Sequence, residues 1–176
     1  IHSPVPLAHP LDDGSAVLLK RDPQSTADQL GPDGPAYLRL MTPLVRNWRA
    51  LLEEILGPLR PPRHPLLLAR FGMLALRSAQ GLATARFRGA RARALFAGLG
   101  GHSMLPLETN VSAAAGLILG CLAHAVGWPM AAGGTQQIAE ALAQRLRALG
   151  GEIVTGRQIT SLGELPPARA VLFNTS

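Results

Sequence analysis

The 176 residues of this chain are enough for one domain with a hydrophobic core, or for one and a half small ones. The net charge of +6 comes almost entirely from arginine, because Lys20 is the only lysine. A GC-rich genome also produces such an arginine-dominated composition, together with abundant Ala, Leu, Gly and Pro. The positive charge is therefore weak support for nucleic-acid binding. Cys121 is the only cysteine, so an internal disulfide and a cysteine zinc site are excluded. We expect its thiol to be buried and the protein to lie in a reducing compartment, the cytoplasm.

The two ends of the chain indicate a piece of a longer protein. The sequence starts at Ile1 rather than at Met, and it stops directly after an apolar run that reaches Phe173. No charged segment followed by an apolar one marks a secretory signal, although the first residues of a longer parent protein would lie outside this sequence.

Residues 1–21 are predicted to be extended. Two apolar runs, one containing Leu7 and one over 16–19, flank the sequence Pro-Leu-Asp-Asp-Gly. Asp-Gly between apolar runs is a hairpin signal. We therefore expect a short two-stranded element in which Asp12 and Asp13 are turn residues.

The middle of the chain is predicted to be helical. Ser25 is expected to cap a short helix. Apolar side chains at three- and four-residue spacing predict a long amphipathic helix over 35–57, with a kink or restart at 41–42 because Pro43 lies inside it. Further helical stretches are expected at 66–76, at 81–86 as a turn or short helix, and at 88–99.

The segment 111–126 is apolar on nearly every side, which predicts a buried helix capped by Thr109 or Asn110. It is too short and too interrupted for a membrane span, which needs about 20 apolar residues. Gly116 and Gly120 form a GxxxG pattern, which outside a membrane indicates close helix packing.

The last part of the chain is predicted to contain one helix and three strands. An apolar stripe indicates an amphipathic helix over 135–149. Short strands are expected at 152–155, 158–162 and 170–173. This order of elements predicts an α+β fold, with about five to six helices inserted beside a small β-sheet that N-terminal and C-terminal strands form together.

Several kinds of site are excluded. Neither a G-x-G-x-x-G fingerprint nor a Walker A motif is present, so this chain alone is not expected to hold a nucleotide pyrophosphate. The adjacent carboxylates Glu53 and Glu54 point in different directions on a helix, and the neighbours His102 and Ser103 do not make a catalytic triad. We expect no metal site, because the histidines lack the paired spacing of ligands: His2, His9, His64, His102 and His124.

The best candidate for a charged surface is a basic run of four arginines, Arg86, Arg88, Arg91 and Arg93. Aromatic side chains near it are few, so stacking on bases is poorly supported and nucleic acid is not expected as a partner. Two interpretations stay open: a solvated helix face or connector, and a patch in peripheral contact with a membrane or with phosphate.

One stretch carries a family resemblance. The sequences GWPMAAGGTQQI (127–138) and GGEIVTGRQI (150–159) read as a turn, a Gly-Gly pair, an amphipathic helix, a second Gly-Gly turn and a strand. This pattern resembles the interior of bacterial phytoene dehydrogenase-like FAD-dependent oxidoreductases of the amine oxidase superfamily. The sequence PVPLAHPLDDG (4–14) resembles the paired strands of that family more weakly.

The resemblance implies a set of site residues. Gly133 and Gly134 would lie close to the FAD and the substrate cavity, and the backbone of Ile159 would contact the FAD adenine. His102, in a loop sequence similar to one in bacterial members, and Trp128 would line the substrate pocket. The alternatives are a tight turn for the glycines, an ordinary strand residue for Ile159, and a capping or hydrogen-bonded loop histidine for His102.

The resemblance also implies how the chain is divided. Residues 1–133 would be part of a substrate-binding domain, a strand pair with a helical cover, and residues 134–176 would lead back to the FAD-binding domain. The parent protein would bind FAD non-covalently and transfer a hydride between an apolar substrate and the flavin. The glycine fingerprint for FAD would lie upstream, so the fragment alone is expected to be inactive and its catalytic residues are not identified.

Two other functions compete with this one. The chain can be a non-catalytic helical module that holds an apolar ligand or a protein partner between its helices. The least supported alternative is a basic domain for anionic lipid or nucleic acid, whose binding would depend steeply on salt. In the flavoenzyme case, a piece that exposes the face meant for its FAD domain is expected to self-associate.

Overall fold

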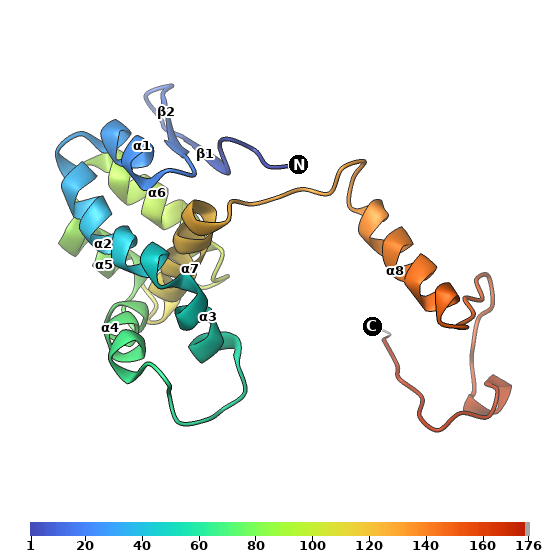
Figure 1. Cartoon of the computed structure of the whole chain (residues 1–176). Helices are drawn as coiled ribbons and strands as arrows, with labels where there is room; N and C mark the ends of the chain where they lie inside the picture. Colours follow the sequence, from blue (N-terminus) through green and yellow to red (C-terminus); the bar gives the residue numbers. More distant parts are fainter. Residues whose placement is uncertain (175–176) are drawn as a thin grey trace. The chain divides into compact units, whose positions relative to one another are not determined.

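A computed structural model describes residues 1–174, and within them the fold is α+β. The chain forms two compact units, Ile1–Met130 and Ala131–Ser176 (Figure 1). The second unit contains α8 (Gln136–Ala148) and the 3-10 helix η2 (Leu162–Glu164). The elements of the first unit are β1 (Leu7–Pro10), β2 (Ala16–Leu19), α1 (Pro23–Ala27), the 3-10 helix η1 (Asp28–Asp33), α2 (Gly34–Arg46), α3 (Trp48–Leu56), α4 (Pro65–Ala75), α5 (Ala79–Arg86), α6 (Ala90–Gly101) and α7 (Ser112–Ala125).

The predicted hairpin is confirmed. Strands β1 and β2 are antiparallel, with Leu7 opposite Leu19. The turn closes where the Leu11 N–H donates to the Ser15 carbonyl at 2.9 Å and the Ser15 N–H donates to the Asp13 carboxylate. Gly14 has a φ of +77°, a left-handed conformation that favours glycine, which explains the Asp-Gly signal.

The helix cap predicted at Ser25 is wrong. Asp22 caps α1 instead, because its carboxylate accepts hydrogen bonds from the backbone N–H groups of Gln24 and Ser25. The Ser25 hydroxyl donates to the same carboxylate at 2.7 Å. Asp and Ser are both good capping residues, and the helix begins one turn earlier than expected because Pro23 fits its first position.

The long predicted helix is broken at Asn47 rather than at 41–42. Pro43 lies inside α2 without ending it. The Asn47 side chain donates to the Pro43 carbonyl at 2.9 Å, while the Asn47 N–H donates to the Leu44 carbonyl. The side-chain amide thus takes the place of the regular backbone bond, and α3 starts at the next residue.

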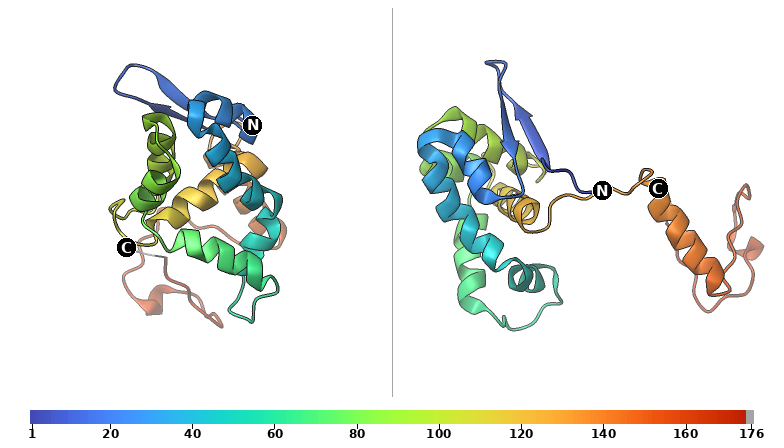
Figure 2. Two further views of the ribbon diagram at one scale, coloured as in Figure 1. Left: turned by 90° about the vertical axis from the view of Figure 1, so that its left-hand side faces the viewer. Right: turned by 45° about the horizontal axis from the view of Figure 1, so that its top comes forward.

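The core of the first unit is built around α7, which contacts α2, α3, α4, α5 and α6 (Figure 2). The two glycines of the GxxxG pattern are buried at these contacts. A Cβ at Gly116 would lie 3.0 Å from the Phe96 ring, and one at Gly120 would lie 2.5 Å from the Met41 methyl group. The predicted close packing of this helix is therefore confirmed. Among residues 1–174, no helix has the length and apolar character to cross a membrane.

The two ends of the first unit are paired with each other. The Ile1 ammonium group donates to the Met130 carbonyl at 2.8 Å, and the Met130 N–H donates to the Ile1 carbonyl at 2.9 Å. His2 and Pro129 form an isolated antiparallel bridge at the same place.

The strands predicted at 152–155, 158–162 and 170–173 are not formed, so the sheet consists of β1 and β2 alone within the described residues. The described segment after α8 contains no strand, and Leu162–Glu164 is a 3-10 turn. Apolar composition alone does not make a strand, because its backbone groups need a neighbouring strand to bond. In α8 the predicted amphipathic helix is confirmed.

Candidate functional site

The loop between α6 and α7 has a strained backbone. Met104 and Val111 have φ angles of +59° and +75°, a conformation that side chains with a Cβ rarely adopt and that a β-branched residue adopts least readily. Neighbouring contacts hold the loop in place, since the Val111 N–H donates to the Leu76 carbonyl at 3.3 Å and the Ser112 hydroxyl accepts from the Ala79 N–H at 2.8 Å. Strain that is held in this way clusters at functional sites.

The predicted pocket residues His102 and Trp128 come together beside this loop. Their ring centroids are 6.4 Å apart and the ring planes meet at 76°. His102 is exposed at the C-terminal end of α6, while Trp128 follows α7 and packs, half-buried, against the core. Met104 and Leu105, just after His102, are also exposed. The arrangement offers an apolar ligand an aromatic surface and one imidazole hydrogen-bonding group.

The three residues assigned to the cofactor lie in the second unit. Gly133 and Gly134 are exposed, with φ angles of +80° and +92°, and they lead into α8. Ile159 is 39% exposed on a segment without helix or strand. The left-handed angles require glycine for the turn itself, whether or not a ligand binds there. The aromatic pair belongs to the first unit and these three residues to the second.

A polar pair that the sequence interpretation missed is buried between α2 and α7. The Tyr37 hydroxyl lies 2.7 Å from Nε2 of His124, and Nδ1 of His124 lies 3.1 Å from the Arg21 carbonyl. Because a carbonyl only accepts, Nδ1 carries the proton and Nε2 accepts from the Tyr37 hydroxyl. Burial lowers the pKa of His124, against a smaller opposing effect of the hydrogen bond to Arg21, and this favours the neutral imidazole.

The basic run is divided by its contacts. Arg91 donates to the Gln29 and Ala16 carbonyls and to the Ser15 hydroxyl, which ties α6 to the hairpin and η1. Arg93 donates to the Phe87 carbonyl at 2.8 Å. These two guanidinium groups are therefore part of the fold, which favours the connector interpretation for this half of the run.

A carboxylate anchors the start of α6. Asp33 is 5% exposed, and its oxygens accept hydrogen bonds from the backbone N–H groups of Arg88 at 2.9 Å and Gly89 at 2.6 Å. A Cβ at Gly89 would lie 3.2 Å from the Asp33 carboxylate, so the glycine allows this close approach. No local sequence pattern identifies Asp33 as an anchor, and its role becomes visible only in the folded chain.

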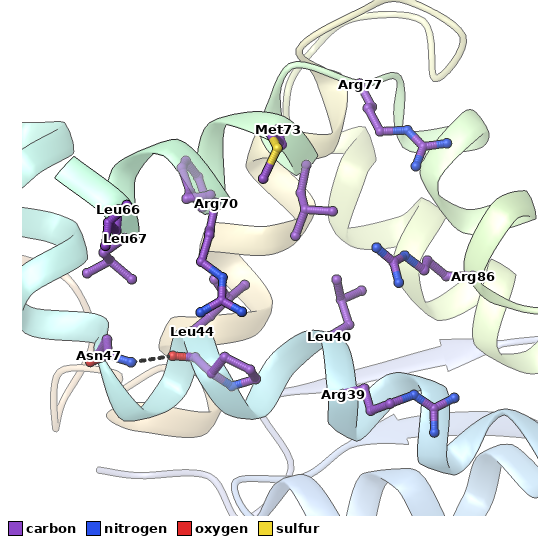
Figure 3. Close-up of a pocket in the computed structure, with 13 residues that line it drawn as sticks. Arg39, Leu40, Leu44, Asn47, Leu66, Leu67, Arg70, Met73, Arg77 and Arg86 are labelled. Atoms are coloured by element: carbon purple, nitrogen blue, oxygen red, sulfur yellow. Dashed lines mark hydrogen bonds between the residues drawn. The ribbon is translucent and has the colours of Figure 1, made fainter. Parts of the chain in front are cut away.

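A half-open groove of about 630 Å³ lies between α2, α4 and α5 (Figure 3). Its base is apolar, and Leu40, Leu44 and Phe71 are buried there. The cationic groups around it come from three helices and the turn after α4: Arg39, Arg70, Arg77 and Arg86. Because these arginines are far apart in sequence, no local sequence pattern predicts the groove.

The part of the chain that the structure describes contains no group of three or more His, Cys, Asp or Glu side chains placed to hold a metal ion. Comparison of the chain with protein-family profiles, with curated proteins and with solved structures gives no match.

Proposed function

We propose that this chain is the substrate-side portion of a cytoplasmic FAD-dependent oxidoreductase similar to bacterial phytoene dehydrogenases. The first unit would cover an apolar substrate, and the second would lead back to the FAD-binding domain. The sequence resemblance over 127–138 and 150–159 supports this proposal. When bound, the flavin would supply the redox chemistry by accepting or returning a hydride.

The observation that carries the proposal is the exposure of apolar side chains in the second unit. Ile138, Leu142 and Leu146 follow one another along one face of α8, and their exposed fractions are 56%, 68% and 45%. None of the residues in α8 is buried. A helix with an apolar stripe is normally stabilised by packing that stripe against a folded partner. In the proposed parent protein, the FAD-binding domain would provide that partner.

The glycine turn fits a cofactor that approaches closely. Gly133 and Gly134 are exposed and lack a Cβ, so a ligand can reach their backbone. The N-terminus of α8, which comes directly after them, has no side-chain cap, and the positive end of its helix dipole favours an anionic group. These residues would bind and orient the cofactor, while Trp128 and His102 would shield and position the substrate.

The visible absorption spectrum of a protein extended in both directions through its parent gene tests this proposal. We expect flavin absorption from the purified extended protein. If the extended protein is colourless and stays so with added FAD, the proposal is wrong.

Two glycine substitutions in the extended protein test the cofactor contact. Gly134 and Gly150 both have left-handed φ angles, +92° and +83°, and a Cβ would find open space within 4 Å at either one. Alanine therefore introduces similar backbone strain at both. We expect Gly134→Ala to lose bound flavin and Gly150→Ala to keep it. Equal flavin content in the two variants would remove Gly134 from the cofactor site.

A further inference from the structure

The groove between α2, α4 and α5 has the dimensions of a small-molecule site. Its volume of about 630 Å³ lies inside the range of roughly 300–1,000 Å³ that is usual for ligand pockets. All of its lining residues belong to the first unit, and the lining includes neither His102 nor Trp128. The groove is therefore a different place in the first unit from the aromatic pair assigned to the substrate.

The base of the groove can hold an alkyl chain. Leu40, Leu44 and Phe71 close it from below, with exposed fractions of 5–6%. Leu66 and Met73 on α4 also line the groove, and they are 80% and 68% exposed. An apolar ligand lying there would remove this surface from water, which is the main source of affinity for such a ligand.

The rim of the groove is cationic. Figure 3 shows the side chains of Arg70 and Arg86 reaching from α4 and α5 toward the space above Leu44 and Leu40. No Asp or Glu is among the described residues that line the groove. Arg77 donates one hydrogen bond, to the Gly81 carbonyl, and keeps further N–H groups for a ligand. A guanidinium fork matches a carboxylate or phosphate in two parallel hydrogen bonds.

From this combination we infer that the groove binds a single-chain amphiphile with an anionic head group, a carboxylate or a phosphate. The alkyl chain lies on Leu40, Leu44 and Phe71, and the head group is bound by Arg70 and Arg86. Charge complementarity selects the anion, because four arginines surround the groove without a carboxylate among its lining residues. A flat bilayer surface would not reach side chains that lie at the base of a groove, which favours a monomeric amphiphile.

Titration calorimetry with laurate, below its micellar concentration, tests this inference on the full chain. We expect laurate to bind and dodecanol to bind at least tenfold more weakly. Shortening the chain from laurate to decanoate should weaken binding by about two- to fourfold per methylene. A parallel titration with dodecyl phosphate identifies the head group. Tighter binding of laurate would assign a carboxylate, and tighter binding of dodecyl phosphate would assign a phosphate.

Matched charge variants locate the site. Arg70→Gln and Arg86→Gln should each weaken laurate binding by about three- to tenfold. Arg63→Gln removes the same charge from an exposed loop outside the groove and should leave the affinity unchanged. Equal losses in all three variants, equal affinity for laurate and dodecanol, or binding seen only with vesicles of anionic phospholipid would each overturn the inference.

Discussion

The Tyr37 hydroxyl lies 2.7 Å from Nε2 of His124, and the two side chains are only 1% and 4% exposed. The pair joins the start of α2 to the end of α7, 87 positions apart in the chain. Their rings also meet edge to face, with centroids 5.7 Å apart. A polar contact so deep in the core stabilises the unit only while both partners are present, because either one alone would be left without a hydrogen bond.

Tyr37→Phe should therefore lower the free energy of unfolding by about 1–3 kcal/mol, because it leaves Nε2 of His124 without its donor. Urea denaturation of the wild type and the variant measures this difference. The double variant Tyr37→Phe/His124→Leu removes both polar groups. We expect its decrease in the free energy of unfolding to be smaller than the sum of the decreases in the two single variants. Strict additivity would show that the two groups are not coupled.

His124 should make stability depend on pH. Burial lowers its pKa below the ordinary value of 6.5, so the unfolded chain binds a proton that the folded chain does not. Stability is therefore full above about pH 6.5 and falls as the pH decreases, by at most about 1.4 kcal/mol per pH unit. Asp22, which lies near, has a pKa below its ordinary 3.8, so its own effect appears at lower pH.

Urea denaturation at about pH 7.5, 6.0 and 5.0, values that span the ordinary pKa of histidine, measures this dependence. His124→Gln should lose the slope below about pH 6.5, while the exposed His102→Gln keeps it. A slope that survives in His124→Gln would assign the effect to another group.

Asp33→Ala should destabilise the first unit by about 1.5–3 kcal/mol, because it removes a buried charged acceptor and leaves the N–H groups of Arg88 and Gly89 unpaired. Hydrogen exchange at these two amides should rise in the variant. Asp12→Ala is the control, since Asp12 is exposed in the hairpin turn and its loss should change stability by less than about 0.5 kcal/mol. Similar effects of the two substitutions would contradict the anchoring role of Asp33.

The neighbouring glycines Gly100 and Gly101 should respond differently to alanine. A Cβ at Gly100 would lie 2.7 Å from the Cβ of Ala79, so α5 and α6 would have to separate, at a cost of about 1–3 kcal/mol. A Cβ at Gly101 meets nothing within 4 Å, and alanine there should be neutral or stabilise by up to about 1 kcal/mol. Thermal unfolding of both variants checks the contrast, and a stable Gly100→Ala would show that the contact yields easily.

The thiol of Cys121 should be inert in the folded protein. It is 2% exposed, and burial raises its pKa to about 11, so little thiolate is present at neutral pH. Alkylation by iodoacetamide, monitored by mass spectrometry, should be slow in buffer and fast in urea. Rapid modification of the native protein would mean that α7 opens frequently.

Local periodicity predicts the helices well and the long-range features poorly. Helices are expected at 66–76 and 111–126, and α4 and α7 occupy Pro65–Ala75 and Ser112–Ala125, because their side-chain patterns are set within a few turns. The strand expected at 152–155 does not form, because a strand depends on a partner elsewhere in the chain. Capping choices between neighbours, such as Asp22 and Ser25, depend on which side chain reaches the free N–H groups.

The candidate sites show the same limit. The sequence names His102 and Trp128 separately, and the fold brings their rings together. A lone histidine in an apolar helix is a signal that His124 needs a buried partner, but nothing local identifies Tyr37. The arginines of the groove come from segments that meet only through the packing of α4 and α5 beside α2, so their convergence is invisible before folding.

The hydrogen bonds between Ile1 and Met130 hold the first and last residues of the first unit side by side. A unit whose ends meet can be spliced into a loop of another domain without stretching its host, and it can fold while that host is still incomplete. Joining the ends and opening the chain at the exposed loop around Arg60–Pro62 would preserve every contact of the core. Because Ile1 and Met130 are neighbours, a short linker between them should be enough for such a rearranged chain.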